Sequence, residues 1–250
     1  MPELPEVETI RRDLESRIVG KKIDNKKIKK ISRRGKLLIL ERENDYLLIH
    51  LGMTGQLIFR DKDKVVVGGH EWNNQPDINK FTRKKWCLAD GSELLFNDAR
   101  RFGYYKYVKK PDLSGYGPEA LGFKFPKTDS RSRIKSWLLN QKNIAGLGNI
   151  YTDEVLFRAG IKPTRRINNL NKAELAKIER SIKYVIKKAI ECRGTTFSDY
   201  RDASGRKGNY KKLLKVYGRE NRICKKCKRE KIKKIRLAGR GTHFCGACQF

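Results

Sequence analysis

The sequence predicts an α+β protein of several domains, with a strand-rich N-terminal half, a helical region after it and a small metal-bound hairpin at the C-terminus. Three observations predict this order. Short apolar runs separated by turn residues fill residues 28–108, apolar positions three or four apart recur between 132 and 191, and two Cys-x2-Cys pairs lie beyond residue 222. A chain of 250 residues is long enough for one large domain or two of medium size plus a small module.

The composition points to a polyanionic partner. The chain has 59 Lys and Arg against 28 Asp and Glu, a formal net charge of +31. Nucleic acid is the first candidate and an anionic membrane the second, although part of the lysine excess can be solvated and functionally idle. No apolar run approaches the roughly 18 residues of a membrane span, and the acidic, polar N-terminus has no signal-peptide pattern. We therefore expect a cytoplasmic protein.

The N-terminus carries a candidate nucleophile. If Met1 is removed, which a small second residue permits, Pro2 becomes a free secondary amine. An α-amino group has a pKa of about 8, so a useful fraction can attack an aldehydic carbon and form an iminium, which is an electron sink for elimination. Glu3 and Glu6 are close enough in sequence to act as acid or base. The alternative is that Pro and Glu merely begin the helix that apolar spacing predicts over 6–19.

The next region has the periodicity of strands. Turn residues such as Arg34-Gly35 and Asp90-Gly91 separate the runs, and several strands at this spacing suggest a sandwich or a barrel. The predicted strands are 36–41, 46–51, 55–60, 84–88, 94–96 and 104–108.

Helices dominate after a break. Residues 109–129 contain three prolines and three glycines and are predicted to be a linker. Helices are then predicted over 132–141 and 172–191, the latter being the most clearly amphipathic. Between them, in the segment 144–160, the two glycines Gly146 and Gly148 force a turn before another helix. A helix–turn–helix pair in a basic protein suggests DNA binding, although most such pairs are only structural. The Gly-rich segment 202–208 is expected to be a loop, either an idle connection or a lid over a ligand.

Four of the six cysteines form a metal-binding pattern. Two Cys-x2-Cys pairs separated by seventeen residues fit a four-thiolate zinc site, with two disulfides as an alternative that a cytosolic setting disfavours. We expect one structural Zn²⁺ per chain, because four thiolates leave no open position, and the metal should supply much of the folding energy of so short a segment. Cys87 and Cys192 are interpreted as buried or bystander thiols. The predicted ligands are Cys224, Cys227, Cys245 and Cys248.

The spacer between the cysteine pairs is expected to fold back as a hairpin. Residues 233–237 and 242–244 alternate as strands should, and Gly239-Arg240-Gly241 can make the turn. Arg240 would then lie at the tip, where it could contact a phosphate or the minor groove, or could be a solvated turn arginine.

Seven segments, in order from end to end, resemble the bacterial formamidopyrimidine-DNA glycosylase / endonuclease VIII family, on its formamidopyrimidine side. No single segment is decisive, but the collinear set is highly specific. The segments are Met1-Pro2-Glu3-Leu4-Pro5-Glu6-Val7-Glu8-Thr9, Arg33-Arg34-Gly35-Lys36, His50-Leu51-Gly52-Met53-Thr54-Gly55, Asp98-Ala99-Arg100-Arg101-Phe102-Gly103, Gly146-Leu147-Gly148-Asn149-Ile150-Tyr151, Val216-Tyr217-Gly218-Arg219 and Gly239-Arg240-Gly241-Thr242-His243-Phe244-Cys245.

The resemblance implies a DNA clamp with a β-sandwich over 1–115, a linker over 116–130, a helix–two-turns–helix domain over 131–221 and a zinc finger over 222–250. It implies a bifunctional glycosylase and lyase of base excision repair. Such an enzyme excises oxidised purines, mainly 8-oxoguanine opposite cytosine and formamidopyrimidines, from damaged double-stranded DNA. We expect a monomer that acts at the nucleoid.

The resemblance also implies the catalytic group. Pro2 would attack the anomeric carbon of the sugar and displace the base, while Glu3 would shuttle protons on the sugar and Glu6 would support the site. β- and δ-elimination from the iminium would then release both phosphates. Lys36, the fourth residue of this catalytic group, matches a position that grips a phosphate in the family. It could otherwise be a charge on an edge strand.

Other matched positions are expected to contact DNA. The damaged nucleotide must leave the stack to be reached, and Met53, Arg100 and Phe102 would fill or wedge the gap. The two apolar side chains could otherwise be core fillers. Phosphate contacts are expected from Asn149 and Arg240, with Tyr217 and Arg101 as weaker candidates, although Asn149 could simply cap a helix. The loop of residues 202–210 aligns with one that closes over the everted base.

The chain departs from the family pattern in three places. It is shorter between Gly20 and Ile31, so that a helix and a strand of the sandwich are expected to be missing. Phe81 and Arg83 stand where the family often has a His-x-His pair, so a backbone contact there is lost or made differently. The zinc spacer is one residue longer than is common.

Two other functions compete. The first is the same chemistry on oxidised pyrimidines, as in the endonuclease VIII branch, against which residues 4–9 and the Met53–Phe102 pair argue. The second is a non-catalytic lesion-binding DNA clamp, which would not need Pro2, Glu3 and Lys36 together. A ribosome-associated zinc protein would also be basic, but it would not need the acidic N-terminus.

Overall fold

The computed structural model describes residues 2–61, 64–70, 80–195, 200–201 and 208–250. The chain divides into two compact units. The first unit comprises Met1–Leu113 and Ala189–Lys211, and the second unit comprises Ser114–Lys188 and Lys212–Phe250. Among the described residues, no helix is both long enough and apolar enough to span a bilayer.

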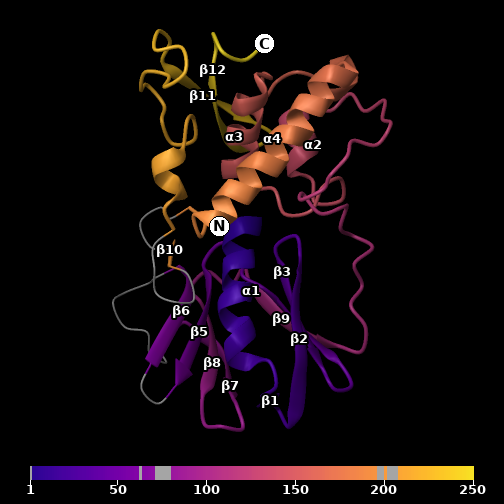
Figure 1. The fold of residues 1–250 in the computed structure, drawn as a ribbon, viewed down its shortest axis with the longest axis vertical. Coiled ribbons are helices and arrows are strands. Elements are labelled where there is room, and N and C mark those ends of the chain that lie inside the picture. Colours follow the sequence, from indigo (N-terminus) through magenta and orange to yellow (C-terminus); the bar gives the residue numbers. More distant parts are fainter. Residues whose placement is uncertain (1, 62–63, 71–79, 196–199, 202–207) are drawn as a thin grey trace. The chain divides into compact units, whose positions relative to one another are not determined.

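The elements follow the predicted order of strands, helices and a final hairpin (Figure 1). They are α1 (Leu4–Ile18), β1 (Lys22–Ile23), β2 (Lys26–Arg34), β3 (Leu37–Arg42), β4 (Tyr46–His50), β5 (Gly55–Asp61), β6 (Lys64–His70), β7 (Thr82–Cys87), β8 (Glu93–Asp98), β9 (Tyr104–Val108), α2 (Ile134–Leu139), α3 (Asn149–Ala159), a 3₁₀ turn (Ile167–Asn169), α4 (Lys172–Glu191), β10 (Tyr200–Arg201), a second 3₁₀ turn (Tyr210–Leu213), β11 (Ile232–Leu237) and β12 (Arg240–Cys245).

The first unit is the predicted β-sandwich. One antiparallel sheet has the order β1-β2-β3-β4-β9 and the other has the order β10-β6-β5-β8-β7. Alternate residues of both sheets enter one core, which confirms the sandwich rather than the barrel. The core residues from the two sheets include Leu38, Leu40, Leu47, Ile49, Leu57, Phe59, Leu94 and Phe96.

Helix α1 packs against this core. In Figure 1 the helix lies in front of the two sheets. Its buried stripe consists of Val7, Ile10, Leu14 and Ile18, which have the spacing of one helix face. The helix begins at Leu4, two residues before the predicted start, because Glu3 takes the N-cap position and the fixed φ of a proline suits the first turn.

A tight hairpin follows α1 in the region between Gly20 and Ile31, where we expect the chain to be shorter than the family pattern. Strands β1 and β2 pair so that Ile23 lies opposite Lys26, which leaves only Asp24 and Asn25 in the turn. Their φ angles are 49° and 61°, the left-handed pair that a two-residue type I′ turn requires and that Asp and Asn tolerate. This hairpin and the strands β6 and β10 were not predicted from the sequence.

The second unit contains the helical region and the zinc hairpin. α4 has the predicted bounds, and α2 is shorter than predicted. α3 begins at Asn149, directly after the predicted turn at Gly146 and Gly148. α3 ends at Gly160, whose φ of 75° is the left-handed cap that favours glycine.

The zinc hairpin forms as predicted, but its turn is displaced by one residue. Leu237 pairs with Arg240, so Ala238 and Gly239 make the turn with φ angles of 47° and 73°. The prediction of a turn at 239–241 with Arg240 at its tip is therefore wrong. A two-residue loop matches the twist of the flanking strands better, and Arg240 is the first residue of β12.

Candidate active site and nucleic-acid contacts

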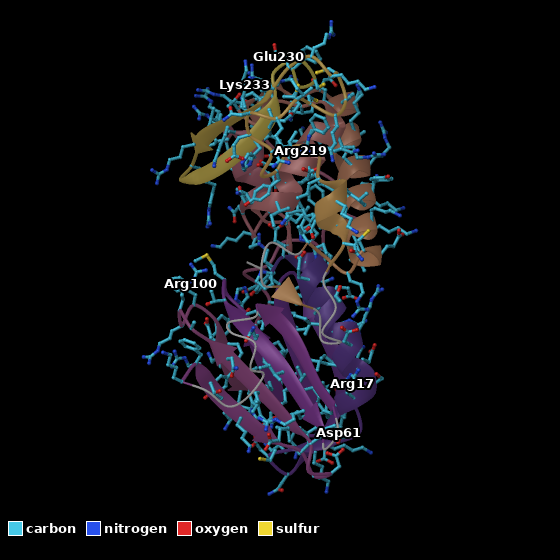
Figure 2. All side chains as sticks on the ribbon, turned by 90° about the vertical axis from the view of Figure 1, so that its left-hand side faces the viewer. Arg17, Asp61, Arg100, Arg219, Glu230 and Lys233 are labelled. Carbon is cyan, nitrogen blue, oxygen red and sulfur yellow. The ribbon has the colours of Figure 1, made fainter. Side chains whose placement is uncertain are left out.

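The candidate residues of the first unit gather at one end of the sandwich. The strand register places the turn at 35–36 beside His50, because Leu37 pairs with His50. His50 in turn pairs with Tyr104, and Gly55 pairs with Asp98. The loops between these strands therefore share one end of the unit. In Figure 2 Arg100 lies at this end, while Asp61, at the other end of β5, lies at the opposite end.

The start of α1 buries the candidate acid–base pair. Pro2, Glu3 and Glu6 are all buried, the two glutamates being 1% and 2% exposed. Glu6 Oε2 accepts the backbone N–H of Glu3 at 2.8 Å, which is one half of a capping box. This bond fixes the peptide that carries the Pro2–Glu3 end of the chain.

A distant segment completes the support of Glu6. Its other oxygen, Oε1, accepts the backbone N–H of Thr195 at 2.7 Å. Gly194 adopts a φ of 82°, and a Cβ there would lie 2.7 Å from the same oxygen. Gly194 and Thr195 were missed from the sequence. The one available signal was a glycine shortly after the end of the predicted 172–191 helix, which predicts a helix stop but not its contact with residue 6.

Lys36 lies in the turn between β2 and β3 and is 7% exposed. The turn is held to α1, because Arg33 donates to Glu8 Oε2 at 3.2 Å and to the carbonyl of Gly35 at 2.7 Å. Burial raises the pKa of Glu8, but hydrogen bonds from Arg11 and Arg12 and the charges of Arg11 and Arg33 lower it overall. An ionised Glu8 therefore joins the start of α1 to the turn that carries Lys36.

His50 is a neutral side chain beside this lysine. Burial, and after it the charge of Lys36, lowers the pKa of His50 to about 4. Its Nδ1 accepts the N–H of Gly52 at 3.1 Å, so the proton of the neutral ring is on Nε2. The ring stacks on Tyr104 with centroids 5.5 Å apart. His50 thus supports the loop that carries Met53.

The two predicted wedge segments lie against each other. Gly52 has a φ of 58°, and a Cβ there would come within 2.5 Å of the backbone of Phe102. Met53 is partly buried, whereas Phe102 is 58% exposed. The guanidinium of Arg100 lies 5.7 Å from the centroid of the Phe102 ring. Arg101 is exposed with a φ of 58°.

In the second unit, the predicted phosphate contacts meet at the zinc hairpin. Asn149, the first residue of α3, donates from Nδ2 to the carbonyl of Gly241 at 3.0 Å. Lys135 on α2 donates to the same carbonyl at 3.0 Å. Because Gly241 follows the exposed Arg240, these bonds fix the position of Asn149 relative to that arginine.

Buried charges support this arrangement. Lys135 forms an ion pair of 2.7 Å with Asp153, and both side chains are at most 1% exposed. The other oxygen of Asp153 accepts the backbone N–H of His243 at 2.8 Å. The ion pair and the bonds of Lys135 to Gly241 and of His243 to Asp153 therefore join α2, α3 and β12 at one point. Lys135 and Asp153 were not singled out from the sequence.

Tyr217 is placed by a second buried carboxylate. Glu154 on α3 is 3% exposed and accepts the N–H groups of Lys215, Val216 and Tyr217 at 2.9–3.1 Å. Burial raises the pKa of Glu154 despite these three donors. The Tyr217 ring lies 4.9 Å from the ring of His243, which brings it to the hairpin as well.

The four predicted zinc ligands form one cluster. Their Sγ atoms all lie within 4.8 Å of one another. The Cys224–Cys248 and Cys227–Cys245 pairs are 3.8 Å apart, and tetrahedral Zn–S bonds of about 2.3 Å place sulfur atoms about 3.8 Å apart. The thiol set therefore fits a closed zinc site. In the surrounding core lie Phe157 and Val216.

The remaining predictions are partly outside the described residues. Met1 and residues 202–207 of the predicted 202–210 loop are outside them. Cys87 is exposed and Cys192 is half-buried, so neither is a fully buried thiol.

Comparison with known proteins gives three family matches. Residues 1–28 and 21–105 match the formamidopyrimidine-DNA glycosylase N-terminal domain, and residues 119–201 match the formamidopyrimidine-DNA glycosylase H2TH domain. Residues 224–249 match a zinc finger found in FPG and IleRS.

Relatives match over the full length. A formamidopyrimidine-DNA glycosylase of Desulfitobacterium hafniense is 38% identical, with 100% of each chain covered, and one of Streptococcus mutans is 36% identical, with 100% of this chain and 99% of the relative covered. The structure of Lactococcus lactis Fpg in complex with DNA containing an abasic site superposes with a TM-score of 0.85 at 34% identity, covering 99% of each chain. A complex of that wild-type enzyme with DNA containing N7-benzyl-Fapy-dG gives a TM-score of 0.85 at 35% identity, again covering 99% of each chain.

Proposed function

The chain belongs to the formamidopyrimidine-DNA glycosylase family, and from this premise we propose that it excises oxidised purines, 8-oxoguanine opposite cytosine and formamidopyrimidines, from duplex DNA and then cleaves the strand. The observation that carries the proposal is the similarity along the whole chain to formamidopyrimidine-DNA glycosylases, one of them solved in complex with DNA containing an abasic site. It acts in base excision repair as a monomer on the DNA of the nucleoid. We also propose the predicted domain order, with boundaries at 115, 130 and 221.

The chemistry begins at the N-terminus. With Met1 removed, the secondary amine of Pro2 attacks C1′ of the damaged nucleotide, and the C1′–N bond breaks as the base leaves with a proton. The sugar ring opens to an iminium on Pro2. Glu3 carries protons between the sugar and the leaving groups. Glu6 holds the Pro2–Glu3 peptide through the Glu3 N–H.

The iminium then directs strand cleavage. It acidifies the adjacent sugar carbon, so loss of that proton expels the 3′ phosphate by β-elimination, and a second elimination expels the 5′ phosphate. Hydrolysis of the iminium by water frees the amine. Lys36 stabilises the phosphate charge at this point, as its place at the same end of the first unit allows.

The other predicted residues hold the DNA. Met53 and Phe102 replace the stacking that the everted nucleotide leaves, and Arg100 donates to the orphaned cytosine. Asn149, Arg240 and Tyr217 grip phosphates from the second unit, with Arg101 as a further contact. One structural Zn²⁺ on the four cysteines maintains the hairpin that carries Arg240.

The test is borohydride trapping on a duplex with one 8-oxoguanine opposite cytosine. Wild-type protein should give a covalent adduct, and Pro2→Gly should lose most of it. A second variant with an N-terminal extension before Pro2 removes the free secondary amine and should give none. Binding of each variant to the same duplex serves as the control for folding.

The outcomes separate the candidate functions. Trapping only on an oxidised pyrimidine would keep the mechanism and overturn the substrate. Binding of wild-type protein without trapping on any lesion or abasic site would favour the lesion-binding clamp and overturn the enzymatic function.

A further inference from the structure

We propose that Asp98 and Arg83 are positioning residues that hold the segments 51–55 and 98–103 together as one preformed wedge, and that recognition of the base opposite the lesion depends on them. The segments 51–55 and 98–103 are called the wedge loops below. The inference rests on the proposed function, because it assigns to the wedge loops the task of filling the space that the everted nucleotide leaves.

Asp98 joins the two wedge loops through its side chain. It is 1% exposed, at the end of β8. Its Oδ1 accepts the hydroxyl of Thr54 and the N–H of Arg100, the latter at 3.3 Å, and its Oδ2 accepts the N–H of Gly103 at 2.7 Å. A buried carboxylate with a separate donor set on each oxygen fixes the direction of all its partners. One side chain thus fixes the backbone at Arg100 and at Gly103, which flank Arg101 and Phe102.

The backbone of Asp98 is also held, by hydrogen bonds to Phe81 and Arg83. Its N–H donates to the carbonyl of Phe81 at 2.9 Å, and its carbonyl accepts Nε of Arg83 at 2.9 Å. Both backbone groups and both carboxylate oxygens of Asp98 are therefore bonded. Asp98 cannot rotate or shift without breaking several of these bonds, so it is a rigid anchor for the loops.

Arg83 reaches Asp98 because the strand is irregular there. The pairing of β7 with β8 shifts between Thr82 and Lys84, which leaves Arg83 as the extra residue of a β-bulge. A bulge redirects the side chain of the extra residue. Arg83 is one of the two residues expected to stand where the family often has a histidine pair, and in this chain its Nε is bonded to the carbonyl of Asp98.

Glycines let the wedge loops approach closely. A Cβ on Gly103 would lie 2.8 Å from the carbonyl oxygen of His50, and one on Gly55 would lie 2.3 Å from the carbonyl oxygen of Leu51. A Cβ on Gly103 would also lie 3.0 Å from the carbonyl oxygen of Leu51, so Gly103 and Gly52 allow the two backbones to approach each other, whereas Gly55 tightens the loop 51–55 itself. Met53, Arg100 and Phe102 therefore extend from one rigid base rather than from two independent loops.

Rigidity matters for the opposite base because a hydrogen bond discriminates only when its donor is already in place. A loop that orders on binding loses part of the interaction energy to conformational entropy. The anchored loops should hold the Arg100 guanidinium where it can donate a hydrogen bond to an opposite cytosine but not to an opposite adenine.

The experiment compares Asp98→Asn, Thr54→Val and Arg83→Met with wild type. Thr54→Val keeps the shape and removes the donor to Asp98, and Thr54→Ser, which restores the hydroxyl, is its matched partner. Single-turnover excision is measured on 8-oxoguanine opposite cytosine and opposite adenine. Trapping on an abasic site in single-stranded DNA is measured in parallel, since no opposite base is present there.

We expect Asp98→Asn and Thr54→Val to lower excision opposite cytosine about 10- to 100-fold, since a hydrogen bond to a buried charge is lost. The preference for cytosine over adenine should shrink by about tenfold, while trapping on the single-stranded abasic site stays within about twofold of wild type. Arg83→Met should show a smaller change in the same direction, and Thr54→Ser should recover most of the loss.

If the variants lose equal activity on the duplex and on the single-stranded substrate, Asp98 only stabilises the fold and the inference is wrong. An unchanged preference for cytosine over adenine would also overturn it. Binding to a duplex with a tetrahydrofuran abasic analogue opposite cytosine or adenine gives the same comparison without catalysis. If wild type fails to excise 8-oxoguanine, the proposed function fails, whereas the binding preference still decides on the wedge.

Discussion

At the scale of single residues, the geometry around Pro2, the proposed nucleophile, depends on a glycine far away in sequence. Glu6 holds the Glu3 peptide with one oxygen and the Thr195 peptide with the other. Gly194 permits this because its φ is 82° and it carries no side chain where Glu6 Oε1 lies. The start of α1 is therefore positioned by the segment that follows α4, and Gly194 should matter for the proposed catalysis through Glu6.

We predict that Gly194→Ala reduces the rate of Schiff-base trapping about 10- to 100-fold, because the new Cβ displaces the Glu6 carboxylate from two buried donors. Gly91→Ala is the matched control. Gly91 has a φ of 84°, and a Cβ added there would meet nothing within 4 Å, so this variant should lose about 1 kcal/mol of stability and no activity. Trapping rate and melting temperature are measured for both. Equal trapping rates in the two variants would refute the positioning role.

A second residue, His50, should make stability depend on pH. Its pKa is about 4 in the folded chain and 6.5 when unperturbed, so the unfolded state binds the proton first as pH falls. Its contribution is complete above pH 6.5 and is lost as pH falls towards 4, by about 3 kcal/mol in all. Denaturant unfolding at a series of pH values measures this loss.

His50→Asn is the control for this prediction. An asparagine keeps an acceptor for the Gly52 N–H and does not titrate. Subtracting its stability profile removes the loss of carboxylates such as Glu8, whose pKa is lowered in the fold. If the difference between the two profiles is flat from pH 6.5 to 4, His50 is not the neutral support described above.

At the scale of elements, the sequence predicts what local pattern determines. α4 has the predicted bounds. The apolar residues of α1 form the predicted buried face, and the four cysteines form the predicted cluster. β2 was missed because a bulge between Ile28 and Lys30 leaves its buried Ile28 and Ile31 three residues apart, which breaks the alternation of a strand. Its many lysines also conceal the apolar pattern.

The zinc hairpin is the element whose folding depends most on a single interaction. It has a short two-stranded sheet and a small core around the thiols. Structural zinc contributes about 10–16 kcal/mol in small fingers, more than such a core supplies. We predict that chelation unfolds residues 222–250 and releases Gly241 from Asn149 and Lys135.

Trypsin measures this outcome directly, because the segment is rich in Lys and Arg. Metal-free protein should be cleaved within 222–250 and should lose DNA affinity, and added Zn²⁺ should restore both. Cys227→Ser should behave like the chelated protein at low zinc. Resistance to trypsin in a sample with no bound metal would show that the hairpin does not need the ion.

At the scale of the whole molecule, the contacts that complete each site were beyond prediction. The Glu6–Thr195 bond spans 189 positions and the Asn149–Gly241 bond spans 92. No local periodicity reports such pairs, because they depend on how the chain returns to itself. Family resemblance located the predicted site residues, but their roles stay predictions, and their supporting residues came only from the structure.

The formal charge of +31 belongs to the whole molecule, yet DNA affinity should depend on only a few of its charges. Salt dependence counts the phosphates that a protein neutralises, not its net charge. Arg240→Gln should therefore weaken binding about equally on all sequences and reduce the slope of log K against log salt by about 1. Lys30→Gln removes an exposed charge of β2 that no proposed contact uses, and it should leave the slope unchanged. Titrations at several salt concentrations with a fixed duplex measure both slopes. If the two variants lower the slope equally, the lysine excess binds DNA diffusely and Arg240 has no special place in the interface.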